Sequence, residues 1–107
     1  MSLPFFTGET LVIRFRTREV PPWPVLEGTV RPATPIEVRA YVNRLAAVKL
    51  DDAAGERRTR SEFYAAHIKT WNAGEQVTPA LVASLCNPLF DQLEEVCTGH
   101  GGLVLGN

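Results

Sequence analysis

Hydrophobic and polar residues alternate near the start of the chain, over residues 10 to 17. Three apolar side chains share one face of such an extended segment: Leu11, Ile13 and Phe15. This period of two predicts a strand with one buried face.

Prolines within residues 20 to 24 stop the strand, because proline lacks a backbone N–H and fixes φ. Residues 25 to 31 resume an extended pattern in which Leu26 and Val30 share a face. The two segments predict an antiparallel β-hairpin over residues 10 to 31, which needs helices to cover it.

A helix start follows this hairpin. Thr34 is placed as the N-cap, Pro35 as the first helical residue, and Glu37 where its side chain can close a capping box. Apolar residues then recur at helical spacing as far as about Leu50. The stripe comprises Val38, Tyr41, Val42, Leu45 and Val48. We therefore predict an amphipathic helix that begins at Pro35.

The apolar pattern breaks around Gly55 and resumes at helical spacing over residues 56 to 71. Its stripe comprises Phe63, Tyr64, His67, Ile68 and Trp71. The spacing predicts a second helix that ends at Trp71, with the indole buried at the corner of an αα-hairpin. Residues 72 to 74 contain the asparagine and glycine expected where a chain leaves a helix.

A further helix is predicted to begin at Pro79, because Thr78 and Pro79 repeat the N-cap and first-position signals. Asn87 and Pro88 interrupt it, since a proline inside a helix removes a hydrogen bond and clashes with the preceding turn. Either a sharp kink or a new helix capped by Asn87 is expected. Gly99 is a natural helix stop.

These elements predict an α+β fold that is mainly helical, with three to four helices and an N-terminal two-stranded β-hairpin. The 107 residues correspond to one domain by length. Its parts are an N-terminal arm at residues 1 to 9, the β-hairpin at 10 to 31, a helical part at 34 to 98 and a glycine-rich tail at 99 to 107. The predicted structural anchors are Thr34, Glu37, Trp71 and Thr78.

Charge and composition narrow the range of partners. Eleven Lys and Arg against twelve Asp and Glu give a net charge of -1, far from the basic balance of a nucleic-acid-binding module. No apolar run approaches the roughly 20 residues that a membrane-spanning helix needs. Two cysteines without a secretory leader do not suggest a disulfide framework. We expect a cytoplasmic protein that binds neither nucleic acid nor membranes.

One set of residues could supply metal ligands: His67, Cys86, Cys97 and His100. Cys97 and His100 have a spacing that a metal can use, but neither a Cys-x-x-Cys nor a His-x-x-x-His pair is present. Both cysteines lie on apolar faces, where free cysteine usually acts as a small hydrophobe. We therefore expect no metal, no cofactor and no catalytic residue. A small metal-dependent enzyme is the alternative that depends on this set.

Four residues are candidates for binding a protein partner: Trp23, Arg57, Arg58 and Arg60. The three arginines form the one basic cluster, which suits an acidic partner, although a solvated helix face is the more ordinary role. Trp23 stands among prolines. Its side chain either packs back over the hairpin or stands out as an interaction anchor.

A longer pattern resembles a known family. The chain has a helix start RPATPIEVRAYVNRL at residues 31 to 45, Trp71-Asn72 after an apolar stripe, a short loop with Gly74, and Val-Thr-Pro before leucine-rich helices. This combination resembles the tail assembly chaperones of long-tailed bacteriophages and prophages. The residues that carry the resemblance are Thr34 to Leu45, Ile68 to Asn72, Gly74, Val77, Thr78, Leu81, Leu85, Leu89 and Leu93. It covers residues 25 to 97.

The resemblance implies a non-catalytic role. Such a protein would coat the tape measure protein before the tail tube polymerises around it, and then leave. The implied partners are therefore the tape measure and tail tube proteins. This role requires exposed apolar surface and self-association, so a homo-oligomer is expected. The alternative function is a small bacterial adaptor or regulatory module that docks a partner through the Trp23 loop or the basic cluster.

Overall fold

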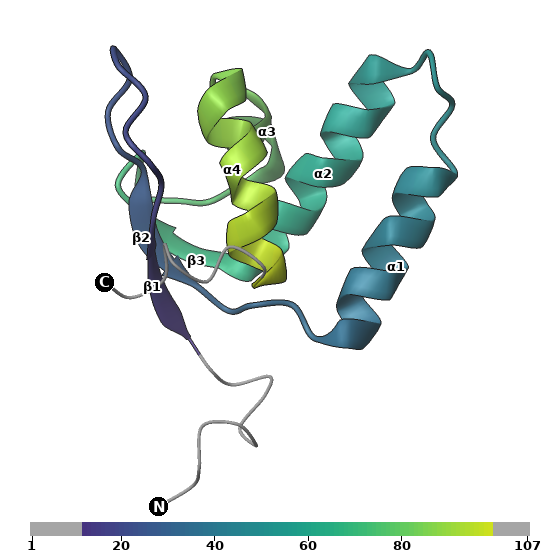
Figure 1. The fold of residues 1–107 in the computed structure, drawn as a ribbon, viewed down its shortest axis with the longest axis horizontal. Helices are drawn as coiled ribbons and strands as arrows, with labels where there is room; N and C mark the ends of the chain where they lie inside the picture. The colour runs from purple at the N-terminus through teal and green to yellow at the C-terminus, as the bar shows by residue number, and fades with distance from the viewer. Residues whose placement is uncertain (1–11, 100–107) are drawn as a thin grey trace, which may run out of the picture.

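The computed structural model describes residues 12 to 99, which form a three-stranded antiparallel sheet and four helices (Figure 1). In chain order the elements are β1 (Ile13–Arg16), β2 (Glu27–Val30), α1 (Pro35–Ala46), α2 (Ala53–His67), β3 (Ile68–Trp71), α3 (Pro79–Ala83) and α4 (Asn87–Thr98). The predicted α+β class, with an N-terminal hairpin followed by a mainly helical part, is confirmed. The predicted N-terminal arm, and the tail beyond Gly99, lie outside the described residues.

The sheet has β2 at its centre, with β1 and β3 on either side. Phe15 of β1 and Trp71 of β3 both lie opposite Gly28 of β2, so the three residues form one row across the sheet. Phe15, Trp71 and Val30 are buried in the core. The residues that alternate with Phe15 in β1 are exposed, as expected for a sheet with one covered face.

The predicted helix through Trp71 is wrong in its last turn. α2 ends at His67, and the next four residues are the edge strand β3, which pairs with β2. Hydrogen bonding to β2 continues past the end of this strand, because Asn72 N–H donates to the Glu27 carbonyl over 3.0 Å. Trp71 is buried as predicted, but it ends a strand and does not form the corner of an αα-hairpin.

The predicted helix caps are confirmed at three places. Thr34 and Glu37 form a complete capping box, with Pro35 in the first turn. Thr78 caps α3 through the backbone N–H of Leu81. Gly99 ends α4 in the left-handed conformation, at a φ of 80°. α1 ends at Ala46, before the predicted limit at Leu50.

The break at Asn87 and Pro88 separates two helices, which was one of the two predicted outcomes. The N-cap of α4 is Cys86, however, and it makes no side-chain cap hydrogen bond. Asn87 was predicted to cap this helix, but its side-chain oxygen instead accepts a hydrogen bond of 2.7 Å from Nη1 of Arg57. The side chain of Asn87 therefore hydrogen-bonds Arg57, which is distant in the sequence, and does not cap α4.

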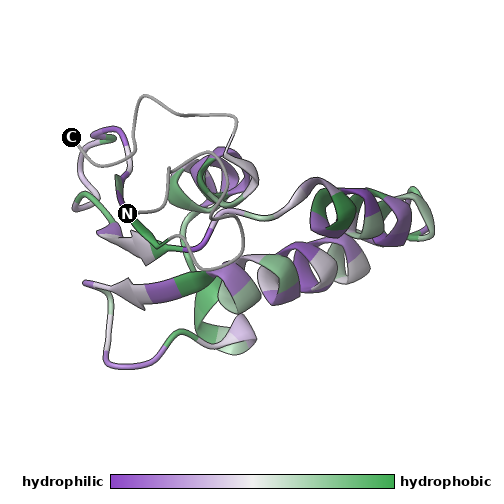
Figure 2. Ribbon diagram, turned by 90° about the horizontal axis from the view of Figure 1, so that it is seen from below, coloured by the Kyte–Doolittle hydropathy of each residue, from purple (hydrophilic) through white to green (hydrophobic). Residues whose placement is uncertain are grey.

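α2 is the central helix, since it contacts α1, α3, α4 and β3. The two views in Figures 1 and 2 agree that α1 lies farthest from the sheet, beside α2. The largest buried side chains of the core come from α1, α2 and α4: Tyr41, Tyr64, Phe63, Phe90 and Leu93. Because α1 has α2 as its main neighbour, much of its surface is left uncovered.

Candidate functional site

One half of the apolar stripe of α1 is packed against the rest of the domain. The ring of Tyr41 stacks on Phe63 of α2 with 3.9 Å between ring centroids. Its hydroxyl donates to Oε2 of Glu94 in α4 over 2.9 Å. Burial is the main cause that raises the pKa of Tyr41, so this hydroxyl stays protonated and keeps its donor role. Tyr41 therefore fixes α1 to the two helices beside it.

The other half of the stripe is open. Val42 follows Tyr41 directly and is 52% exposed, while Val38 is half-buried one turn earlier. Together with the end of α4, these side chains form a groove of about 460 Å³. We call it the α1–α4 groove, and its lining residues are Ala33, Pro35, Val38, Arg39, Val42 and Thr98. Apolar atoms dominate this lining, with the cationic Arg39 among them, so it suits an apolar segment of a partner.

A polar cluster fixes the end of α1 from which the groove begins. Both carboxylate oxygens of Glu37 accept hydrogen bonds from the guanidinium of Arg31, over 3.1 and 2.9 Å. Oε1 of Glu37 also accepts from the backbone N–H of Thr34. Nε2 of His67 lies 3.6 Å from the same oxygen, and Nδ1 of His67 hydrogen-bonds the Phe63 carbonyl. The first turn of α1 is thereby tied to Arg31 after β2, whose backbone N–H in turn donates to the His67 carbonyl over 2.9 Å.

Acid is expected to weaken this cluster. The hydrogen bond from Arg31, followed by that from Thr34, lowers the pKa of Glu37 from 4.5 to about 2. Since the folded-state pKa lies below the unfolded one, ionised Glu37 stabilises the fold above pH 4.5, and this contribution is lost as the pH falls toward 2. Melting temperatures measured across this range should therefore fall more for the parent than for Glu37→Gln, whose side chain does not titrate. Equal acid sensitivity of the two proteins would contradict this assignment.

Two arginines of the predicted basic cluster are engaged inside the domain. Nε of Arg57 donates to the Ala83 carbonyl over 2.8 Å, and Nη2 donates to the Leu85 carbonyl. Arg60 contacts Asp91 of α4 through Nη2 at 3.1 Å. Both guanidinium groups also lie over the ring of Phe90, at 3.9 and 4.7 Å from its centroid. These contacts join α2 to α3 and α4, so Arg57 and Arg60 have structural roles whatever else they bind.

Arg58 and Trp23 are the two predicted partner-binding residues that face solvent. Arg58 is exposed on α2 and forms no ion pair with any other residue between 12 and 99. Trp23 is 42% exposed, in the loop between β1 and β2. Its backbone N–H donates to the Val20 carbonyl over 3.0 Å, which closes a tight turn. The ring of Trp23 is therefore partly covered and partly in solvent.

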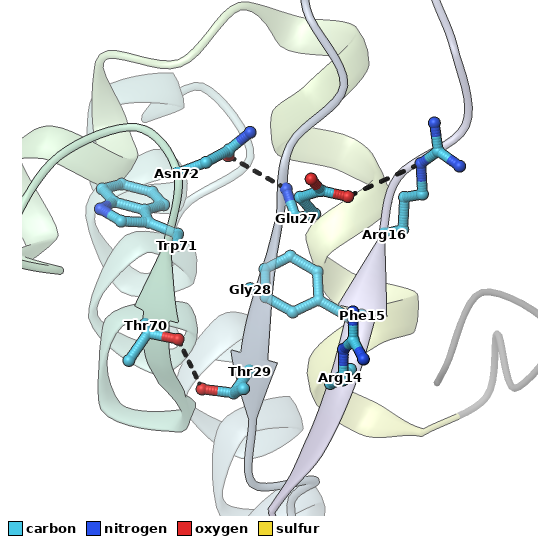
Figure 3. A pocket seen from close by; sticks show the side chains of 9 residues that line it. All are labelled: Arg14, Phe15, Arg16, Glu27, Gly28, Thr29, Thr70, Trp71 and Asn72. Carbon is cyan, nitrogen blue, oxygen red and sulfur yellow. Dashed lines mark hydrogen bonds and ion pairs between the residues drawn. The ribbon is translucent and has the colours of Figure 1, made fainter. Parts of the chain in front are cut away.

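The uncovered side of the sheet carries a depression of about 390 Å³ with both polar and apolar lining, which the sequence pattern did not indicate (Figure 3). The hydroxyls of Thr29 and Thr70 hydrogen-bond each other over 2.7 Å across β2 and β3. The single carboxylate of the lining, that of Glu27, lies 3.8 Å from Nε of Arg16. None of the described residues that line this depression is a histidine or a cysteine.

The predicted cysteine and histidine set is not gathered into a site in the part of the chain that is described. Between residues 12 and 99, no group of three or more His, Cys, Asp or Glu side chains is placed to hold a metal ion. Cys97 is fully buried in α4, where burial raises the pKa of its thiol. His100, the fourth member of the set, lies outside the described residues.

No family model, curated protein or solved structure matches this chain. Among residues 12 to 99, the helices are too short or too polar for any of them to cross a membrane. Of the surfaces described above, the α1–α4 groove is the one lined mainly by apolar atoms of a helix that has a single main neighbour.

Proposed function

We propose that this chain is a non-catalytic tail assembly chaperone of a long-tailed phage or prophage, which binds the tape measure protein in the bacterial cytoplasm. The observation that supports this proposal is the uncovered apolar half of α1, which borders the α1–α4 groove. The resemblance noted in the sequence supplies the nature of the partner. A chaperone that must hold and later release a long client needs exposed apolar surface more than it needs a reactive site.

The groove suits a helical client. An amphipathic helix binds by laying its apolar residues into a hydrophobic groove, at spacings of three and four residues. Val38 and Val42 are themselves spaced by one helical turn, so they offer successive contacts to such a helix. Arg39 lies between them in the chain and also lines the groove, where it can pair with a carboxylate on the polar side of the client.

Binding to the tape measure protein tests this function directly. We expect Val42→Asp to weaken the complex by about 30-fold or more, because it places a charge where an apolar side chain of the client would be buried. The measurement is titration calorimetry with a purified helical segment of the tape measure protein encoded near this gene. Since Val42 is half exposed, the variant should keep the circular dichroism and melting temperature of the parent.

Ile36→Asp is the matched control. Ile36 lies on the same helix and is 82% exposed, but it does not line the groove. This variant should bind as the parent does. If Val42→Asp also binds like the parent, the client site is elsewhere. If the parent binds no segment of the tape measure protein, the proposed function is wrong.

A second candidate function is supported by the exposed ring of Trp23. In this alternative the chain is a small adaptor that docks a partner through the loop between β1 and β2, where an aromatic anchor stands among prolines. Trp23→Ala would then abolish partner capture, whereas Val42→Asp would leave it unchanged. The opposite result favours the chaperone.

A further inference from the structure

The connection between α1 and α2 presents an apolar side chain and a carboxylate together at its tip. The backbone N–H of Asp52 donates to the Lys49 carbonyl over 3.0 Å, which closes a four-residue turn. Leu50 and Asp51 occupy the two central positions of this turn, and Leu50 is fully exposed. Asp52 then caps α2, because its Oδ1 accepts from Gly55 N–H over 2.9 Å. We call Leu50 and Asp51 the Leu50 knob, and hydrogen bonds of the flanking residues Lys49 and Asp52 define the turn that carries it.

A second apolar groove lies between α2 and α3, with a volume of about 330 Å³. Small side chains form most of its walls, and two arginines complete the lining. Its residues are Ala54, Arg57, Arg58, Ser61, Pro79, Ala80 and Ala83, and we call it the α2–α3 groove. Nearly all of the exposed lining is apolar. This combination fits an apolar side chain that has a carboxylate next to it.

The two arginines of this groove carry positive charge that no carboxylate pairs within residues 12 to 99. Arg57 donates to carbonyl oxygens and to the Asn87 amide, which hold its guanidinium in place without neutralising it. Arg58 is exposed. Asp51 is also exposed and forms no ion pair in the same described part of the chain. Leu50 and the α2–α3 groove therefore share apolar character, and Asp51 and Arg58 carry opposite charges.

We propose that two copies of this chain associate by placing the Leu50 knob of each in the α2–α3 groove of the other. Leu50 would contact the small side chains of the groove, and Asp51 would pair with Arg58. The knob and the groove are close along the chain, since Ala54 of the groove follows Leu50 by four residues. In the proposed dimer a two-fold axis would bring each knob to the opposite groove, as in other isologous dimers.

This association is independent of the proposed client site, because the α1–α4 groove and the α2–α3 groove share no residue. A dimer with so small a contact is expected to be weak and to form reversibly as concentration rises. Two copies joined in this way would leave both α1–α4 grooves open.

Analytical ultracentrifugation over a range of concentrations tests the inference on the full chain. The parent should show a reversible monomer–dimer equilibrium. We expect Leu50→Ser to raise the dissociation constant by about tenfold or more, because each dimer loses two buried leucines. Ala80→Leu should weaken the dimer to a similar extent, because the larger side chain at position 80 would fill the groove and exclude Leu50 of the other copy. Ile36→Ser, which removes another highly exposed aliphatic side chain, should dimerise like the parent.

A charge exchange tests the pairing itself. Asp51→Arg and Arg58→Asp should each weaken the dimer, because each leaves like charges facing one another. The double variant restores opposite charges and should recover most of the parent's affinity. Circular dichroism should be unchanged throughout, since both side chains are exposed. A parent that stays monomeric at all concentrations, a Leu50→Ser protein that dimerises like the parent, or a double variant that does not recover would each overturn the proposal.

Discussion

Trp71→Ala is expected to destabilise the domain by about 3 to 5 kcal/mol, which is a large part of the roughly 5 to 15 kcal/mol that holds a typical domain folded. The indole is 8% exposed and belongs to the hydrophobic core. Its Nε1–H donates to the Gln76 carbonyl over 3.1 Å, so the ring also ties the loop after β3 to the strand. The variant loses core packing and this hydrogen bond together. Urea unfolding followed by circular dichroism measures the change in free energy of unfolding.

Trp23→Ala is the control for this measurement, because it removes the same side chain from a partly exposed position in a loop. It is expected to change the free energy of unfolding by about 0.5 kcal/mol or less. A Trp71→Ala protein that unfolds at the same urea concentration as Trp23→Ala would show that the indole of Trp71 is not part of the core. In that case Trp71 would become a candidate for partner binding.

Helix boundaries could be predicted from the sequence wherever local chemistry decides them. Thr34 and Thr78 each stand just before a proline, and in both places the threonine hydroxyl accepts a backbone N–H three residues later. Gly99 ends α4 because glycine adopts a positive φ without a Cβ clash. Each of these features depends on residues within one helical turn, so the local sequence is enough to predict it without knowledge of the fold.

The strand β3 could not be predicted in this way. In Ile68–Trp71 the first and last side chains are buried and the two between them are exposed, which is a helical spacing and not the alternation of a regular strand. The irregularity comes from the register shift between Thr29 and Val30 in the pairing of β2 with β3. The partner strand lies about forty residues earlier in the chain. Local periodicity therefore indicated correctly that Ile68 and Trp71 are buried, but it did not indicate that their backbone is extended.

The candidate site could be predicted in part. The stripe of α1 was visible in the sequence, but nothing local distinguishes Tyr41, which α2 covers, from Val42, which it leaves open. The basic cluster shows the same limit. Arg57 and Arg58 are adjacent in sequence, yet Arg57 donates to the chain around Ala83 to Asn87, whereas Arg58 faces solvent. Which residue is free to bind depends on where the neighbouring helices pack.

Gly28→Ala is expected to be the other strongly destabilising substitution, because β3 leaves no room for a side chain at residue 28 of the central strand. A Cβ on residue 28 would lie 1.9 Å from the Thr70 carbonyl oxygen and 2.7 Å from Cα of Trp71. Both atoms belong to the backbone of β3, so neither can rotate away as a side chain can. Strand β3 would have to move from β2. The cost is expected to reach or exceed the upper end of the range for overpacked sites, about 3 kcal/mol.

Gly74→Ala is the matched control, since the nearest atom to a Cβ on residue 74 would be Nε1 of Trp71 at 3.9 Å, an ordinary contact distance. Its stability should stay within about 1 kcal/mol of the parent, and a small gain is expected because alanine restricts the unfolded chain. Urea unfolding of both variants provides the comparison, and near-ultraviolet circular dichroism reports the environment of Trp71. If β2 and β3 are paired in this register, Gly28→Ala should lose the signal of the packed indole well before Gly74→Ala does. Two variants with equal stability would contradict the close approach of the strands, and with it the placement of residues 68 to 71 in the sheet.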